Sequence, residues 1–90
     1  MRKIALTTKG DTEFKRAMIY EPLDASGVFI FLFRSLEDGP CDADFWYQDL
    51  GGAERHAEVE LGIKNFDWQH VSDPLPGCQE DRLASIPTVN

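Results

Sequence analysis

The chain has 90 residues, a formal net charge of −7, and an ordinary share of apolar (42%) and aromatic (11%) residues. This length allows one small domain over residues 1–90 whose single core buries roughly two-thirds of the unfolded surface, and the composition excludes wholesale disorder. The acidic balance disfavours nucleic acid as a partner, and no apolar stretch approaches the roughly 18 residues needed to cross a membrane.

The acidic residues concentrate after residue 20. Residues 1–20 carry five basic and two acidic side chains, whereas residues 21–90 carry four basic and fourteen acidic ones. Such a surface keeps a small protein in solution, and it also suits docking of a basic partner. Only three apolar residues separate the basic start from Thr7, too few for a secretory signal. We therefore expect a cytoplasmic location, with Cys41 and Cys78 as reduced thiols.

The first half of the chain predicts antiparallel strands. Arg2 to Thr8 alternates between apolar and polar residues and is followed by the turn signal Lys9-Gly10-Asp11. Phe14 to Tyr20 and Val28 to Arg34 are separated by a loop rich in Pro, Asp, Ser and Gly. Their spacing predicts a β-hairpin. A shorter aromatic strand is expected over Asp44 to Gln48.

The segment Val28 to Phe33 is an uninterrupted apolar run, which predicts a strand covered on both faces. Because side chains alternate across a strand, one face presents Val28, Ile30 and Leu32, and the other presents three phenylalanines. The aromatic face needs a cover. The sequence favours Trp46 and Trp68 for this, and leaves open that a partner or a second copy covers it.

A helix is predicted over Leu50 to Leu61. Asp49 suits the N-cap, and Gly62 suits a left-handed C-terminal residue. At about 100° per residue, the four residues Leu50, Ala53, Ala57 and Leu61 form one apolar stripe, with Val59 on the opposite side. The small residues of the stripe indicate close packing against the aliphatic face of Val28 to Phe33. The fold class predicted is α+β, an antiparallel sheet of four to five strands with one main helix on one face.

After the helix, the pattern indicates a turn of 3₁₀ helix over Asn65 to Trp68 and extended chain over Gln69 to Val71. Ser72 to Asp81 contains two prolines and a glycine and predicts an ordered loop. Leu83 to Val89 is a candidate final strand, placed at a sheet edge because Pro87 cannot donate to a ladder.

The span from Phe45 to Arg82 resembles uncharacterised small bacterial proteins. The resemblance lies in Phe45-Trp46-Tyr47, the helix ending at Gly62-Ile63, Asp67-Trp68-Gln69, and the loop Asp73-Pro-Leu-Pro-Gly-Cys-Gln79. It covers less than half of the chain and implies no activity.

Metal binding and catalysis find little support in the sequence. The four soft ligands Cys41, His56, His70 and Cys78 show no paired metal-ligand spacing, so we expect no metal and no cofactor. His56 falls on a flank of the helix. Cys78 follows a Pro-Gly turn that could present a nucleophile, but Glu80 and Asp81 oppose its ionisation. His70 and Asp73 could form an acid–base pair.

The loop Ser72 to Arg82 is the candidate site, because binding residues are often carried on ordered loops. Its candidate binding residues, with those just upstream, are Trp68, His70, Asp73, Cys78, Gln79 and Arg82. The alternative is a rigid strap that covers one side of the sheet through Leu75 and Cys78.

The sequence favours a small cytoplasmic, non-catalytic binding or adaptor protein. Two alternatives stay open. One is a small enzyme using Cys78 or a His70–Asp73 pair, and the other is a homodimer formed through the aromatic sheet face.

Overall fold

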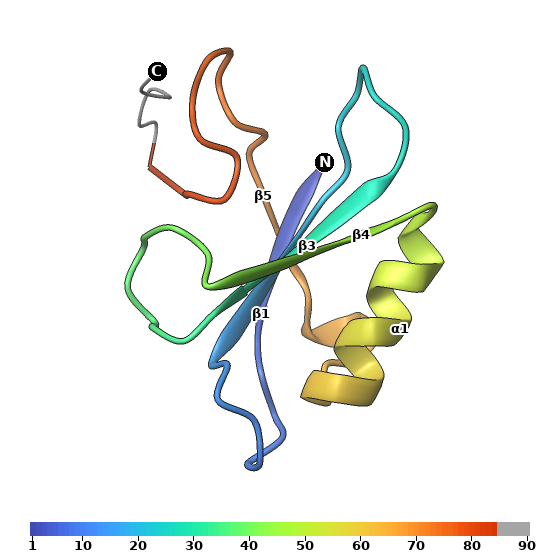
Figure 1. Cartoon of the computed structure of the whole chain (residues 1–90), viewed down its shortest axis with the longest axis vertical. Helices are drawn as coiled ribbons and strands as arrows, with labels where there is room; N and C mark the ends of the chain where they lie inside the picture. The colour runs from blue at the N-terminus through green and yellow to red at the C-terminus, as the bar shows by residue number, and fades with distance from the viewer. Residues whose placement is uncertain (85–90) are drawn as a thin grey trace.

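The computed structural model describes residues 1–84 and contains one five-stranded sheet with one helix packed against it (Figure 1). In chain order the elements are β1 (Arg2–Leu6), β2 (Arg16–Tyr20), β3 (Val28–Phe33), β4 (Ala43–Tyr47), α1 (Leu50–Leu61), the 3₁₀ turn η1 (Asn65–Asp67) and β5 (Gln69–Val71). All neighbouring strands are antiparallel, and their order across the sheet is β4-β3-β2-β1-β5. The predicted α+β class is confirmed.

The register assigns each side chain to one of two faces. Ile30 lies opposite Ile19 and Phe31 opposite Met18, so the aliphatic residues of β3 share a face with Ile19, and its phenylalanines share the other with Met18. We call these the α1 face and the aromatic face. The α1 face, as predicted, packs against α1, and its core is fully or almost fully buried and consists of Ala5, Ala17, Ile19, Val28, Ile30, Leu32, Ala53, Ala57, Leu61 and Ile63.

The helix begins and ends where the sequence predicted. The Asp49 carboxylate accepts a hydrogen bond from the Gly52 N–H, and Gly62 ends the helix at φ 72°. That backbone conformation favours glycine, and its N–H returns to the Glu58 carbonyl while that of Ile63 reaches Ala57. Val59, on the opposite side from the buried stripe, is 57% exposed.

The aromatic face is covered mainly by the chain itself, though not by the two tryptophans. Phe31 and Phe33 are 6% and 1% exposed. Trp68 packs against the core of the α1 face instead, so its predicted position over the phenylalanines is wrong. The reason is the register of β5, because Gln69 lies opposite Ile4 and His70 opposite Lys3. This parity turns Trp68 toward the helix. Trp46 does share the aromatic face but is 53% exposed.

Two buried arginines hold the actual cover of the aromatic face. The Arg2 guanidinium donates hydrogen bonds to the carbonyls of Ser72, Glu80 and Arg82, and that of Arg16 donates to Ser35 and Glu37. Arg2 and Arg16 are only 3% and 6% exposed. They therefore tie two long segments, 35–42 and 72–84, to the sheet.

Several element boundaries differ from the sequence-based ones by one or two residues. β1 ends at Leu6, β2 starts at Arg16, and β4 covers Ala43–Tyr47. Outside β2, the Phe14 carbonyl accepts a hydrogen bond from the Thr7 hydroxyl in place of ladder pairing. Most of the candidate strand Leu83 to Val89 lies outside the described residues. Within residues 1–84, no helix is both long and apolar enough to cross a membrane.

Candidate functional site

A groove runs between α1 and the outer part of the sheet, beside strand β4. We call it the α1–β4 groove, and its volume is about 640 Å³. The small residues Ala53 and Ala57 are fully buried in the core of the α1 face, so α1 packs close to the sheet, and it contacts β4 as well as β3 and β2. The apolar lining of the groove includes Phe14, Phe45 and Val59, and its polar lining includes Thr12, Arg55, His56 and Glu60.

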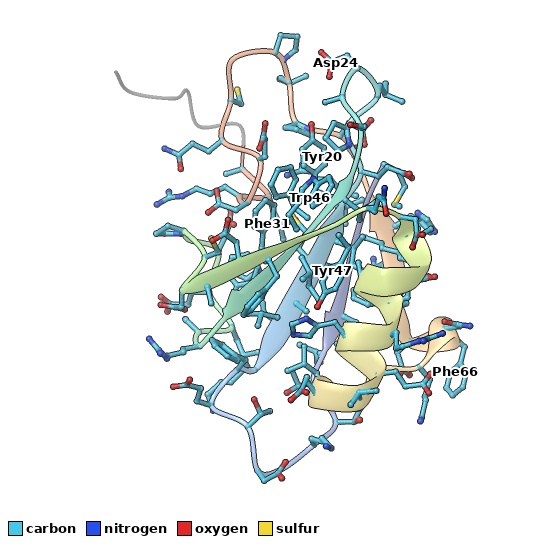
Figure 2. The ribbon with its side chains drawn as sticks, turned by 45° about the vertical axis from the view of Figure 1, so that its right-hand side comes forward. Tyr20, Asp24, Phe31, Trp46, Tyr47 and Phe66 are labelled. Carbon is cyan, nitrogen blue, oxygen red and sulfur yellow. The ribbon has the colours of Figure 1, made fainter. Side chains whose placement is uncertain are left out.

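His56 lies in this groove between two aromatic rings of β4. Its Nδ1 shares a hydrogen bond with the Tyr47 hydroxyl. The imidazole centroid is 5.6 Å from that of Tyr47, edge to face, and 4.9 Å from that of Phe45. Figure 2 shows Tyr47 between the strand and α1, while Phe31 lies on the other side of the sheet.

Burial lowers the pKa of His56 below its ordinary value of 6.5, and the nearby Glu60 charge opposes this without reversing it. The imidazole is therefore neutral at pH 7. A neutral imidazole has one donor and one acceptor nitrogen. Since Tyr47 engages Nδ1, Nε2 is the ring nitrogen left to hydrogen-bond a bound group. The groove thus combines an apolar floor with a few polar atoms, the usual composition of a binding site.

Exposed apolar side chains gather at this groove. Phe45 is 47% exposed and Val59 is 57% exposed, and both line the same hollow. Two other exposed apolar residues, Leu23 and Leu75, line a second hollow between the loops at 20–24 and 73–80, whereas Phe66 stands alone beyond α1, away from β4 (Figure 2). Single exposed apolar residues are normal on protein surfaces, whereas a cluster in a hollow indicates binding.

The residues predicted from the sequence do not converge on one place. Trp68 is half-buried on the α1 face, with the Lys3 ammonium 5.2 Å from its ring centroid. His70 is exposed on β5 and lines a different hollow, together with Arg2, Ser72 and Leu83. No hydrogen bond or ion pair within residues 1–84 joins His70 to Asp73.

Asp73 and Cys78 do share a hollow. It lies between the loops at 20–24 and 73–80, has a volume of about 410 Å³, and also contains Leu23 and Leu75. The Asp73 carboxylate is 2.9 Å from the amino group of Met1. Gln79 and Arg82 are half-buried in the same C-terminal segment, where the Arg82 carbonyl accepts from Arg2.

The strap interpretation, in which Leu75 and Cys78 anchor this segment to the sheet, is wrong about the anchors. Leu75 is 59% exposed and Cys78 only half-buried, so apolar anchoring at these residues is not how the segment is held. The segment is held instead by hydrogen bonds from Arg2 to its backbone carbonyls, and by hydrogen bonds that involve the carboxylates of Asp38 and Asp81. The Asp38 carboxylate accepts from the N–H groups of Leu83 and Ala84, and the Asp81 carboxylate accepts from that of Cys41.

The two cysteines are free thiols. Burial, assisted by the neighbouring carboxylates of Asp81 and Asp44, raises the pKa of the Cys41 thiol to about 12. At neutral pH this cysteine is therefore protonated and a poor nucleophile. Among residues 1–84, no three His, Cys, Asp or Glu side chains come together in a way that could hold a metal ion.

The α1–β4 groove was missed by sequence reasoning, although a signal was present. Val59 stands on the exposed side of the helix, and an exposed valine there has no part in the core. Phe45 and Tyr47 have the period of two that turns both toward the helix. What the sequence did not show was the position of α1 against the sheet, which brings His56 and Val59 to the same strand.

No family model, curated protein or solved structure matches this chain.

Proposed function

We propose that this protein is a small non-catalytic binding or adaptor protein and that the α1–β4 groove is its binding site. The observation that carries the proposal is the pair of exposed apolar side chains, Phe45 and Val59, in a groove of about 640 Å³. The neutral His56 and the charged Arg55 and Glu60 supply the polar contacts that orient a bound group.

The other hypotheses have less support. The hollow of Asp73 and Cys78 is smaller, about 410 Å³, and is our second candidate binding site. A homodimer through the aromatic face has less support because Phe31 and Phe33 are already buried within the chain, although Trp46 beside them is exposed. Catalysis by Cys78 or by a His70–Asp73 pair stays a prediction. We further propose a cytoplasmic location, which the two free cysteines support.

Nuclear magnetic resonance with small aromatic probes tests the binding site directly. Indole, benzoate and phenylguanidine would be titrated separately against isotope-labelled protein while amide shifts are followed. We expect saturable shifts at residues of the groove such as Gly52, His56 and Val59, because an aromatic ring can fill the space beside Phe45. Val59→Asp should abolish these shifts by placing a charge in the apolar lining.

Leu23→Asp is the matched variant, because Leu23 is an exposed aliphatic residue of the competing hollow. If the groove is the site, this variant binds the probes as the unmodified protein does. Shifts that cluster around Asp73 and Cys78 and vanish in Leu23→Asp would transfer the binding function to the C-terminal loop. Absence of saturable shifts at either hollow would overturn the proposal.

A further inference from the structure

The outer edge of β4 is an open edge of the sheet. Within residues 1–84, β4 pairs with β3 and with no other strand. Three of its five residues, Asp44, Phe45 and Trp46, are exposed. In Figure 1 the strand crosses the front of the sheet, next to α1. Its outward N–H and C=O groups are available for pairing with another extended chain.

Proteins usually protect such edges, and the two edges of this sheet differ in that respect. The opposite edge, β5, has only three residues, with Gln69 and His70 exposed, which is a short and polar edge. β4 has five residues, one charged side chain and two exposed aromatic ones. No proline or lysine interrupts it. A long edge carrying exposed aromatic residues is the kind that partner strands use.

The two faces of β4 favour different side chains in a partner strand. Phe45 and Tyr47 point to the α1–β4 groove, so a strand paired here would place alternate residues beside that apolar groove. Asp44 and Trp46 are on the aromatic face. A basic side chain opposite them would pair with the carboxylate and lie against the indole ring.

The surrounding charge favours a basic occupant. Residues 35–61, which contain β4 and α1, have eight acidic side chains and one basic side chain, Arg55. Two of the eight, Asp42 and Glu54, pair with Arg34 and Lys3, which lie outside this range. Asp44 forms no ion pair within the described part of the chain. An approaching cationic segment would be attracted to this region before contact. A second copy of this acidic chain would be repelled, because pairing of two β4 edges brings two Asp44 carboxylates to one interface.

We propose that β4 accepts an extended basic segment of a partner protein as a sixth strand of the sheet. In this segment, apolar residues face the α1–β4 groove and alternate with Lys or Arg residues that face Asp44 and Trp46. The inference rests on the proposed binding function of the groove and adds the class of partner, an alternating basic and apolar strand.

A designed peptide, acetyl-Lys-Val-Lys-Val-Lys-Val-Lys-amide, probes this directly, with the Glu-for-Lys peptide as its counterpart. Binding would be followed by amide shifts and by calorimetry. We expect the basic peptide to bind, with shifts at Asp44, Trp46 and the groove, and the acidic peptide to bind at least about tenfold more weakly. Affinity for the basic peptide should fall as salt is raised.

Charge reversal at the edge gives the matched variants. Asp44→Lys should weaken the basic peptide at least about tenfold and strengthen the acidic one, because the contact is inverted. Glu58→Lys makes the same change in net charge on an exposed part of α1 outside the groove lining, and should change either affinity much less. Equal losses in both variants would show attraction to overall charge and would overturn a docking position at Asp44.

Strand pairing itself is tested by backbone methylation of the peptide. In a strand, alternate N–H groups point to opposite neighbours, so methylation of either all valine or all lysine nitrogens should abolish binding while the other pattern is tolerated. Loss from both patterns, or from neither, would overturn the sixth strand.

The outcomes separate this inference from the proposed function. If the aromatic probes bind in the groove but the basic peptide does not, the groove stays a binding site and only the strand partner is overturned. If the probes fail and the peptide binds at β4, the partner surface stands without a small-molecule site. A concentration-dependent dimer that shields the β4 amides would identify a second copy as the occupant and overturn a basic partner.

Discussion

The imidazole of His56 illustrates how one residue connects the fold with the candidate site. Its Nδ1 is engaged by the Tyr47 hydroxyl and its ring contacts Phe45, so two residues of the edge strand hold it in place. Because the ring is half-buried, it is kept neutral. The same contacts that attach β4 to α1 therefore also set the chemistry of the groove.

The lowered pKa of His56 predicts a pH dependence of stability. In the unfolded chain the imidazole takes up a proton as the pH falls through about 6.5, whereas in the folded protein it resists protonation until a lower pH. The unfolding free energy should therefore fall as the pH drops through this window. Denaturation measured between about pH 5 and pH 7.5 should show this decline, and His56→Gln should reduce it. An imidazole titration midpoint above 6.5 would contradict the assignment.

Tyr47→Phe tests the hydrogen bond to the same imidazole. Removing the hydroxyl leaves Nδ1 without its partner, and we expect a loss of about 1–2 kcal/mol in the unfolding free energy. Tyr20→Phe is a suitable comparison, because Tyr20 is half-buried on the aromatic face and its hydroxyl forms no hydrogen bond within residues 1–84. Equal stability of the two variants would mean that the Tyr47–His56 contact contributes little.

At the scale of elements, α1 has one face in the core and one in the groove. Leu61 is 1% exposed and Val59 is 57% exposed, although only two positions separate them. We expect Leu61→Asp to lower the unfolding free energy by about 3 kcal/mol or more, because it buries a charge under the sheet. Val59→Asp should cost less than about 0.5 kcal/mol. Thermal melts of the two variants that coincide would refute the orientation of the helix.

The elements with regular patterns were predictable from the sequence, and their relative placement was not. The stripe from Leu50 to Leu61, the cap at Asp49 and the turn at Gly62 are local signals, and the structure confirms them. The position of Trp68 depended on the register of β5 against β1, which pairs residues almost seventy positions apart. No local pattern contains that information, and a shift of one residue would have reversed the face.

The candidate site was harder to predict for the same reason. Ser72 to Arg82 carries the local signals of a loop, and the structure assigns no helix or strand to it. Yet Asp73 and His70 lie in different hollows, because β5 ends between them. The α1–β4 groove combines residues of α1, of strands β3 and β4, and of the β1–β2 loop, and no local sequence pattern shows that these segments meet.

At the scale of the whole molecule, polar contacts close the aromatic face. The segments 35–42 and 72–84 lie over this face, and each is tied to the sheet by one buried arginine. The segments are also tied to each other, through Asp38 and Asp81. Figure 2 shows the C-terminal segment on the side of the sheet away from α1. An apolar face is thus covered by two backbone segments, and each segment is held by hydrogen bonds from a buried arginine.

Arg2→Met tests this closure, because methionine keeps much of the apolar stem and removes the guanidinium. Three carbonyls of the C-terminal segment lose their donor, and we expect a loss of about 2–4 kcal/mol in the unfolding free energy. The segment should open locally before the sheet does. Hydrogen exchange should therefore quicken at the amides of Cys78 and Cys41 and stay slow in β3.

Arg34→Met is the control, since Arg34 pairs with Glu13 on the exposed surface, where ion pairs contribute little. Unchanged exchange at Cys41 in Arg2→Met would mean that the carboxylates of Asp38 and Asp81 hold the segment without Arg2.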